Sequence, residues 1–441
     1  MLKRLAAAGG KKLFDHSQMP EELFHWPIIT EEDEQNCLEV IRKNKFSGTD
    51  VTIRFQDEFA AWQGRKYALA FTNGTMSLSA AMFAIGLGMG DEIICPTKTY
   101  WGSVSQAINF GASAVFCNIN ERLSMDPNDL ERCISPRTKA IMVVHYFGYP
   151  CDMDAIMPIA RKYGLKVIED VSHAHGALYK GRKVGTFGDV AAMSMMSWKA
   201  FAAGELGMLV TDDKRLYERA LAYGHYERNN DKNITDPELL PFAHIGLGGV
   251  KGRANQLCSQ LALGQLKYFD ERMAEIDRAM QYFCDGIEDI QGLHPIRPEK
   301  GSGSTMGAWY MPQGTYRPQE LGGLSSGRFA EAIRQETGGQ QCWEGGNFCL
   351  HTHPFFKTFD FYNIGKPSRI AFADRDVREL DAACAPSEKM YCVSLPAFKK
   401  FLPECIDKYI EAYRTVAENY EQLIEKDTSL NGGRWYGSEN K

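Results

Sequence analysis

Short apolar segments alternate with amphipathic segments over residues 66–171, and this alternation strongly limits the folds open to the chain. The apolar runs with the length and composition of strands are KYALAFT, DEIICP, SAVFCNI, KAIMVVHYF and LKVIEDV. The segments between them with helical character are SLSAAMFAIGLG, SVSQAINFGA, DPNDLERCI and MDAIMPIARKYG. Strand–helix alternation predicts a mostly parallel sheet with helices on both faces, a three-layer α/β domain whose functional residues gather at the strands' C-terminal ends.

The alternation of strand and helix segments ends after Asp189. The runs VAAMSMM and MLVTDD lie too close together for a crossover helix, so they are predicted to be antiparallel neighbours. A long amphipathic segment, NQLCSQLALGQLKYFDERMAEIDRAMQYFCDGI, then predicts a helix that leaves this domain, and LPECIDKYIEAYRTVAENYEQLIEK predicts a final helix. We therefore predict an N-terminal segment 1–50, containing a helix at EEDEQNCLEVIRKNKF, a large domain 51–290, a small C-terminal α+β domain 291–425 and a frayed tail 426–441.

Length and charge exclude several classes of function. At 441 residues the chain suits one large and one small domain. The net charge of −6 and the absence of a long basic run argue against nucleic acid or an anionic membrane as the main partner. Twelve cysteines without a C-x-x-C pair predict free thiols in a reducing compartment. The N-terminal apolar stretch is too short for a signal peptide, and no long apolar run occurs, so we expect a soluble cytoplasmic protein.

An acid and a lysine stand out between Glu169 and Asp213. Asp170 ends the predicted strand LKVIED, and Lys199 follows the next apolar run in a turn rich in glycine and alanine. Asp170 could simply terminate a strand or cap a helix, and Lys199 could be a solvated loop lysine. The end of a strand in this topology faces the crevice of the sheet, however, so both residues are candidates for a functional site.

A phosphate site is predicted where the first strand turns into a helix. The segment FTNGTMSLSAAM supplies a turn at Asn73-Gly74 and a hydroxyl at Thr75, followed by a helix. Phosphate groups bind backbone N–H groups and hydroxyls at a helix start, and an ordinary helix cap requires the same geometry.

The segments EDVSHAHGA, GDVAAMSMMSWK and AAGELGM resemble the pattern EDxAQxxGA…GDxxxFSF…K…GxGGM of the DegT/DnrJ/EryC1/StrS family of sugar aminotransferases, and the resemblance runs from about residue 25 to about residue 420. It implies the aspartate-aminotransferase-like fold type I and the cofactor pyridoxal 5'-phosphate (PLP). Lys199 takes the place of the Schiff-base lysine, Asp170 of the acid that pairs with the pyridine nitrogen, and Ser194 of a phosphate-binding serine. His173 replaces the usual glutamine that faces the cofactor 3-oxygen; a purely structural histidine is the alternative.

The same resemblance implies two further contacts to the cofactor. Tyr100 in PTKTYWGS takes the place of the aromatic residue that stacks on the pyridine ring, with Trp101 or simple core packing as alternatives. Lys251 stands where the family's G-x-N-x-R segment, which reaches into the partner's site, has its asparagine, and Arg253 retains the arginine. A homodimer with Lys251 near the cofactor phosphate is therefore implied, and a surface lysine is the alternative.

The resemblance implies transfer of an amino group from glutamate or glutamine to a keto-sugar or keto-cyclitol. A PLP-dependent sugar dehydratase is disfavoured because such relatives carry histidine in place of Lys199; a catalytically idle regulatory protein is the other alternative. The segment GELG, with Glu205, is similar to the GEGG of the cyclitol branch and favours an acceptor without a nucleotide, although Leu206 departs from it. His351 and His353 would share one face of a strand, but no third ligand is evident, so no metal is predicted.

Overall fold

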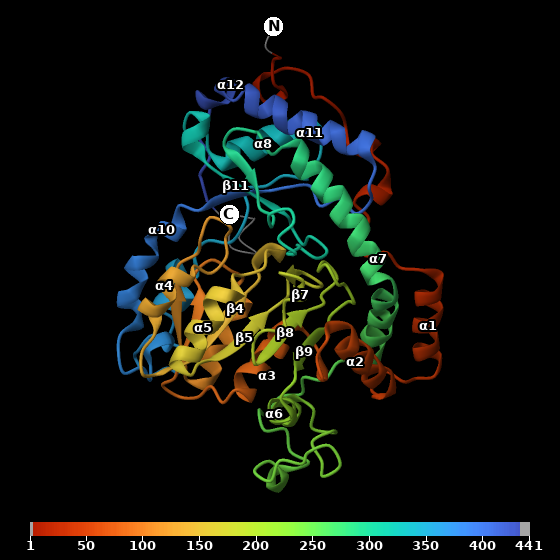
Figure 1. Cartoon of the computed structure of the whole chain (residues 1–441), viewed down its shortest axis with the longest axis vertical. Helices are drawn as coiled ribbons and strands as arrows, with labels where there is room; N and C mark the ends of the chain where they lie inside the picture. The colour runs from red at the N-terminus through yellow and green to blue at the C-terminus, as the bar shows by residue number, and fades with distance from the viewer. Residues whose placement is uncertain (1–2, 433–441) are drawn as a thin grey trace.

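A central sheet of seven strands forms the body of the protein in a computed structural model that describes residues 3–432 (Figure 1). Its order is β1-β9-β8-β5-β4-β2-β3. The strands are β1 (Tyr67–Phe71), β2 (Glu92–Pro96), β3 (Ser113–Cys117), β4 (Thr138–Val144), β5 (Lys166–Asp170), β8 (Val190–Ser194) and β9 (Gly207–Thr211). Only β9 runs antiparallel to its neighbours, β1 and β8, so the mostly parallel sheet and the antiparallel pair β8–β9 are both confirmed.

Helices cover both faces of this sheet. They are α2 (Asp50–Gln63), α3 (Gly74–Ala84), α4 (Pro127–Cys133), α5 (Met153–Tyr163), α6 (Lys214–Gly224) and α7 (Gln256–Gly286). Because strand side chains alternate between faces, β4 sends Ile141 and Val143 into the core on one side and Met142 and Val144 into the core on the other. Two apolar cores therefore sandwich the sheet, which explains why its strands read as continuous apolar runs.

A second, three-stranded sheet lies beyond the end of the first (Figure 1). It consists of β10 (Leu293–Pro295), β11 (Gln313–Tyr316) and β12 (Tyr391–Ser394) in antiparallel order. The helices α8 (Ser326–Thr337) and α11 (Pro403–Glu418) belong to this part of the molecule, and α7 runs from the large sheet up to α11. A small α+β unit therefore stands over the large domain.

The chain returns to the large sheet between β11 and β12. The elements there are η9 (Leu350–Thr352), α9 (Pro354–Lys357), η10 (Ser368–Ile370), η11 (Val377–Cys384) and α10 (Ala385–Glu388). Arg369 is buried in this segment; its Nε donates to the carbonyl of Ala114 on β3 at 2.6 Å, and its guanidinium pairs with Asp381. This segment thus covers the β3 edge of the large sheet, and the division into domains 51–290 and 291–425 stays a prediction.

Several local predictions need correction. The segment SVSQAINFGA forms 3-10 turns, η4 (Trp101–Ser103) and η5 (Ser105–Phe110), because Val104 has the non-helical φ of −141°. The final helix breaks after α11 at Asn419, with a separate turn α12 (Glu421–Ile424). The helix α2 was not predicted at all.

The N-terminal part contains the predicted helix as α1 (Glu31–Arg42), preceded by the short turns η1 (Ala6–Ala8), η2 (His16–Gln18) and η3 (Glu21–Leu23). A small hairpin, β6 (Leu178–Tyr179) and β7 (Arg182–Lys183), and the turn η7 (Leu240–Phe242) complete the described elements. The predicted tail 426–441 is described only to Gly432, so the rest of that prediction lies outside the described residues. Within residues 3–432, no helix combines the length and apolar character needed to cross a bilayer.

Candidate active site

A cavity of about 540 Å³ lies between the large sheet and the small sheet. Val144, Asp170 and Ser194, the last residues of β4, β5 and β8, line it from the large domain. Gln313 at the start of β11 and Ser394 at the end of β12 line it from the small sheet. The cavity thus occupies the C-terminal edge of the parallel strands, where the strand order predicts a site.

Lys199 lies in the turn between β8 and β9 and lines this cavity. Its backbone is fixed on both sides, since its N–H donates to the Met196 carbonyl at 2.8 Å and its carbonyl accepts from the Trp26 indole at 3.0 Å. Burial lowers the pKa of Lys199 to about 8, against the opposing effect of the Asp170 charge. A neutral amine, the form that acts as a nucleophile or base, is therefore accessible near neutral pH.

Asp170 is buried at the end of β5 with its carboxylate held by two donors. The Ser103 hydroxyl donates to Oδ2 at 2.7 Å, and the Ser172 backbone N–H donates to Oδ1 at 3.0 Å. These bonds fix the direction of a negative charge within the same cavity as Lys199. The sequence indicated Asp170 but gave no signal for Ser103.

The turn before α3 forms a cradle at the large-domain side of the cavity. Asn73 caps the helix, and its side chain accepts from the Met76 N–H at 2.8 Å. By helix geometry the N–H groups of Gly74 and Thr75 have no intrahelical acceptor, and the helix start attracts anions. A Cβ on Gly74 would lie 2.5 Å from the Cβ of Ser194, so glycine is required for this close approach. The predicted residues Gly74, Thr75 and Ser194 therefore meet at the cavity wall.

His173 lines the cavity in its neutral form. Burial, followed by the charge of Lys199, holds the pKa of His173 well below its ordinary value. Its Nδ1 is 3.2 Å from the Phe147 backbone N–H, which can only donate, so Nδ1 is the acceptor. The ring proton then resides on Nε2, which is the donor expected if His173 stands in for glutamine.

The structure distinguishes between the two neighbouring aromatic residues. Tyr100 lines the cavity, whereas Trp101 is 45% exposed and does not line it. The two rings contact each other with centroids 4.8 Å apart. The geometry therefore favours Tyr100 as the stacking residue.

Tyr310 is a cavity residue that the sequence did not reveal. Its ring centroid lies 4.4 Å from Lys199 Nζ and 4.5 Å from the centroid of the His173 ring. The flanking residues Trp309 and Met311 have φ of +52° and +46°, values that cost energy for residues other than glycine. Backbone strain thus accompanies the placement of Tyr310. Other lining residues that the sequence did not indicate are Ser103, Ser172, Tyr146, Gln313, Trp343, Glu344 and Asn347.

Comparison with known proteins identifies this arrangement. Residues 27–359 match the model of the DegT/DnrJ/EryC1/StrS aminotransferase family. The chain belongs to this family. The protein is accordingly an aminotransferase, and the family's enzymes depend on PLP.

Relatives within the family differ in substrate. GDP-perosamine synthase of Escherichia coli O157:H7 is 35% identical over 61% of this chain and 72% of its own length. A putative L-glutamine:3-amino-2,3-dideoxy-scyllo-inosose aminotransferase of Micromonospora echinospora is 33% identical over 67% of this chain and 69% of its own. The solved aminotransferase of Psychrobacter cryohalolentis is 27% identical, with a TM-score of 0.76 over 90% of this chain and all of that one. The predicted family and fold type are confirmed.

The cavity of this family member has the chemistry that PLP requires. The cradle at Gly74 and Thr75 offers unpaired N–H donors to a phosphate. Asp170 offers a fixed carboxylate to a ring nitrogen, and the Nε2–H of His173 offers a donor to a ring oxygen. Lys199 offers an amine of lowered pKa to an aldehyde. The residues present therefore fit the cofactor of the family.

Lys251 does not line the cavity of its own chain. It lies in the segment between α6 and α7, next to Gly252, whose carbonyl accepts from the Thr72 N–H at 2.7 Å, and its Nζ is 5.1 Å from the centroid of the Tyr226 ring. The middle of this segment projects from the large domain on the side away from the small sheet (Figure 1). Arg253 turns back to the body of the protein, where it pairs with Glu227 at 2.9 Å. A contact of Lys251 with the cofactor of a partner subunit stays a prediction.

The segment HTHPFF does not form a strand, so His351 and His353 do not share a strand face. His351 lies in the 3-10 turn η9, and His353 caps α9, its side chain accepting from the Phe355 N–H at 3.1 Å. Pro354 lacks the N–H that a strand ladder needs but suits the first helical position, so the chain turns here. His351 is engaged by Thr97 at 2.6 Å and by Glu388 at 3.1 Å. The two histidines thus have separate structural bonds.

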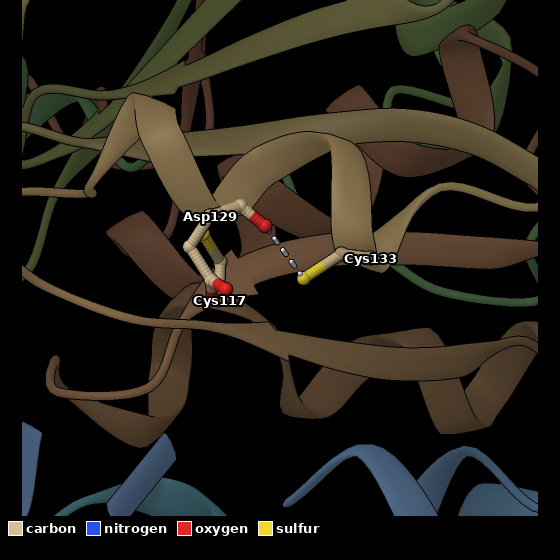
Figure 2. A group of neighbouring side chains, drawn as sticks. All are labelled: Cys117, Asp129 and Cys133. Carbon is tan, nitrogen blue, oxygen red and sulfur yellow. Dashed lines mark hydrogen bonds between the residues drawn. The ribbon is translucent and has the colours of Figure 1, made fainter. Parts of the chain in front are cut away.

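Cys117, Asp129 and Cys133 approach one another at the end of β3, with potential ligand atoms within 4.8 Å (Figure 2). The Asp129 carboxylate already accepts two bonds from Arg132 and one from the Asn118 N–H. A bond with Cys133 and burial raise the pKa of the Cys117 thiol, and the Cys133 thiol lies 3.6 Å from the Asp129 carbonyl. The contacts of these groups account for the cluster without a metal ion.

Proposed function

We propose that this protein transfers the amino group of glutamate or glutamine to the carbonyl carbon of a keto-sugar or keto-cyclitol. The observation that carries the proposal is the buried Lys199, with a pKa lowered to about 8, in one cavity with the fixed carboxylate of Asp170. Relatives named for a GDP-sugar product and for an amino-inosose substrate support the two acceptor classes. A PLP-dependent sugar dehydratase has no such support, because dehydratases of this family carry histidine where this chain has Lys199.

The roles proposed for the residues follow from their positions. PLP, when bound, supplies an aldehyde that takes up amino groups and a ring that withdraws electrons from the neighbouring carbon. The neutral Lys199 Nζ would accept a proton from Cα of the amino-acid donor, and in the reaction with the ketone the protonated Nζ would deliver a proton to the acceptor carbon. Asp170 would hold the ring nitrogen of PLP in its protonated state, and His173 Nε2–H would donate to the ring oxygen. Tyr100 would stack on the ring, while Gly74, Thr75 and Ser194 would bind the phosphate; all of these residues line the cavity.

We further propose a homodimer in which Lys251 reaches the partner's phosphate site. The projecting segment that carries Lys251 exposes large apolar side chains, including Phe242 at 52% and Ile245 at 65%. Trp198, next to Lys199, is 77% exposed. Burial of such surface against a second copy would be favourable, and Lys251 would add a charge-assisted contact. The twelve free cysteines suit the reducing cytoplasm as the site of action.

Chemical labelling tests the proposal directly. Borohydride treatment of the PLP-loaded enzyme should fix a pyridoxyl group to Lys199, detectable by peptide mapping. L-Glutamate or L-glutamine should convert the cofactor to its amine form, with release of the 2-oxo acid, and a keto-sugar or keto-cyclitol should convert it back. Label on another lysine would refute the assignment of Lys199, and conversion by the amino acids without return by any such ketone would refute the acceptor class.

A further inference from the structure

The charged residues of the cavity are mostly acidic. Asp170, Glu205 and Glu344 line it, and among the lining residues of the described chain Lys199 is the only lysine or arginine. Within residues 3–432, Glu205 and Glu344 make no side-chain ion pair or hydrogen bond that would neutralise them. The buried Lys98 lies beside Gly346, but its Nζ donates to the Met390 carbonyl at 2.6 Å and Lys98 does not line the cavity. The cavity therefore lacks a cation of its own for a second anionic group.

Glu344 is held firmly on the small-domain wall. Its neighbours pair with β12, since the Trp343 carbonyl accepts from the Ser394 N–H at 2.8 Å and the Gly345 N–H donates to the Cys392 carbonyl at 2.7 Å. The Trp343 N–H also donates to the Ser394 hydroxyl at 2.8 Å. These bonds on both sides fix the backbone of Glu344, so its carboxylate belongs to a preformed wall rather than to a free loop.

Gln313 adds an unsatisfied acceptor to the same wall. The residue is 1% exposed and lines the cavity. Its Nε2 donates to the Met311 carbonyl at 2.9 Å, which identifies the other atom as the oxygen, and this Oε1 has no hydrogen-bond partner. A Cβ at Gly345 would lie 1.9 Å from Oε1, so glycine leaves the oxygen its space. A buried acceptor without a donor costs free energy of folding. A ligand that donates a hydrogen bond to it would therefore bind more tightly than a ligand that cannot.

We propose that Glu344 and Gln313 select the acceptor, favouring a ketone that bears hydroxyl or ammonium groups and disfavouring a nucleoside diphosphate sugar. A carboxylate and an amide oxygen both accept hydrogen bonds, which ring hydroxyls and ammonium groups donate. A diphosphate has only acceptor oxygens, needs arginine or lysine partners, and is repelled by Glu344. This inference rests on the acceptor class proposed above and narrows it to ketones without phosphate.

Single-turnover kinetics with the pyridoxamine phosphate-loaded enzyme test the selection. The acceptors are scyllo-inosose, an amino-substituted inosose and a nucleoside diphosphate 4-keto-6-deoxyhexose. We expect kcat/KM for the nucleotide sugar to be at least about tenfold below that for both inososes. Glu344→Gln removes the charge but keeps the shape of the side chain. It should therefore raise kcat/KM for the nucleotide sugar and lower kcat/KM for the amino-substituted inosose. Glu22→Gln, which removes the charge of an exposed residue that does not line the cavity, is the matched control and should change neither value of kcat/KM.

Binding supplies a second measurement. Calorimetric titration with a free nucleoside diphosphate should give weak binding to the wild-type protein and binding tightened by about tenfold in Glu344→Gln. Gln313→Leu should weaken both inososes with retained folding by circular dichroism. A wild-type preference for the nucleotide sugar, or a preference unmoved by Glu344→Gln, would overturn the selection while leaving the proposed transamination intact. Failure of all three ketones, with normal reaction of the amino-acid donor, would instead overturn the proposed acceptor class.

Discussion

The Ser103 hydroxyl donates a hydrogen bond of 2.7 Å to Oδ2 of Asp170, and it joins two segments that are far apart in sequence. Ser103 ends the turn η4, whereas Asp170 ends β5. The bond leaves the direction of the carboxylate fixed before any ligand enters. Preorganised charge of this kind stabilises a transition state without reorganisation at the moment of reaction.

Ser103→Ala should therefore lower kcat of the donor half-reaction by about tenfold, the effect of losing one hydrogen bond to a charged group. Cofactor content should remain near normal, because Asp170 keeps its bond from the Ser172 N–H. Stopped-flow absorbance of the PLP enzyme with L-glutamate measures the rate, and a pH titration of the bound cofactor's spectrum distinguishes positioning from general destabilisation. Ser105→Ala is the matched control, since the Ser105 hydroxyl donates to Gln106 and not to Asp170; an equal loss there would contradict a specific role for Ser103.

Asp170→Asn should be more damaging than Ser103→Ala. The amide keeps the shape of the side chain but removes the charge that holds the ring nitrogen protonated, and loss of a buried charged partner typically costs several kcal/mol. We expect the rate to fall by about a hundredfold or more, with PLP still bound. Near-normal turnover would show that a different carboxylate holds the ring.

The lowered pKa of Lys199 predicts a pH dependence of cofactor uptake. Attack on an aldehyde requires the neutral amine, so the rate at which apo-enzyme binds PLP should rise with pH and level off above about 8. Because the negative charge of Asp170 raises the pKa of Lys199, Asp170→Asn should move this midpoint to lower pH. Stopped-flow absorbance over a pH series measures both midpoints. A rate still climbing at pH 10 would mean that the reacting lysine is solvated.

The sequence predicted cavity residues at the strand ends of the large domain, such as Asp170 and Lys199, but it did not predict those that the small domain contributes. Asp170 ends β5, and Lys199 follows β8, the neighbouring strand of the sheet, so the ends of the predicted strands already indicated that the two residues lie close together. Tyr310 and Glu344 reach the same cavity from irregular segments, where no periodicity of apolar residues fixes the direction of a side chain. The positive φ of Trp309 and Met311, which accompany the placement of Tyr310, is also invisible in the sequence because neither residue type favours it.

Two segments differ in local structure from what their apolar pattern suggests. The apolar spacing of SVSQAINFGA suits an α-helix, yet the segment forms two tighter turns, because Val104 between them has a non-helical φ of −141°. At HTHPFF the spacing of the two histidines suits a strand, but Pro354 begins the helix α9 instead, because proline lacks the N–H that a strand ladder needs. Local patterns thus predicted the sheet, but the cavity wall depends on contacts between segments far apart in the chain.

Mixing Lys199→Ala with Lys251→Ala tests whether a site is shared between subunits. Lys199→Ala should abolish turnover, and Lys251→Ala should weaken PLP retention if the partner's Lys251 binds the phosphate. A hybrid dimer of the two would then contain one site with both defects and one with neither. We expect activity to reappear in the mixture, up to about a quarter of wild type when random exchange makes half of the dimers hybrid, each with one intact site of two.

The control is Lys232→Ala, an exposed lysine on the same projecting segment, which should not alter PLP retention by itself. Size-exclusion chromatography with light scattering measures the assembly of each variant and of the mixture. Absence of recovered activity, despite subunit exchange shown with a tagged chain, would mean that Lys251 acts within its own subunit or makes no contact with the cofactor.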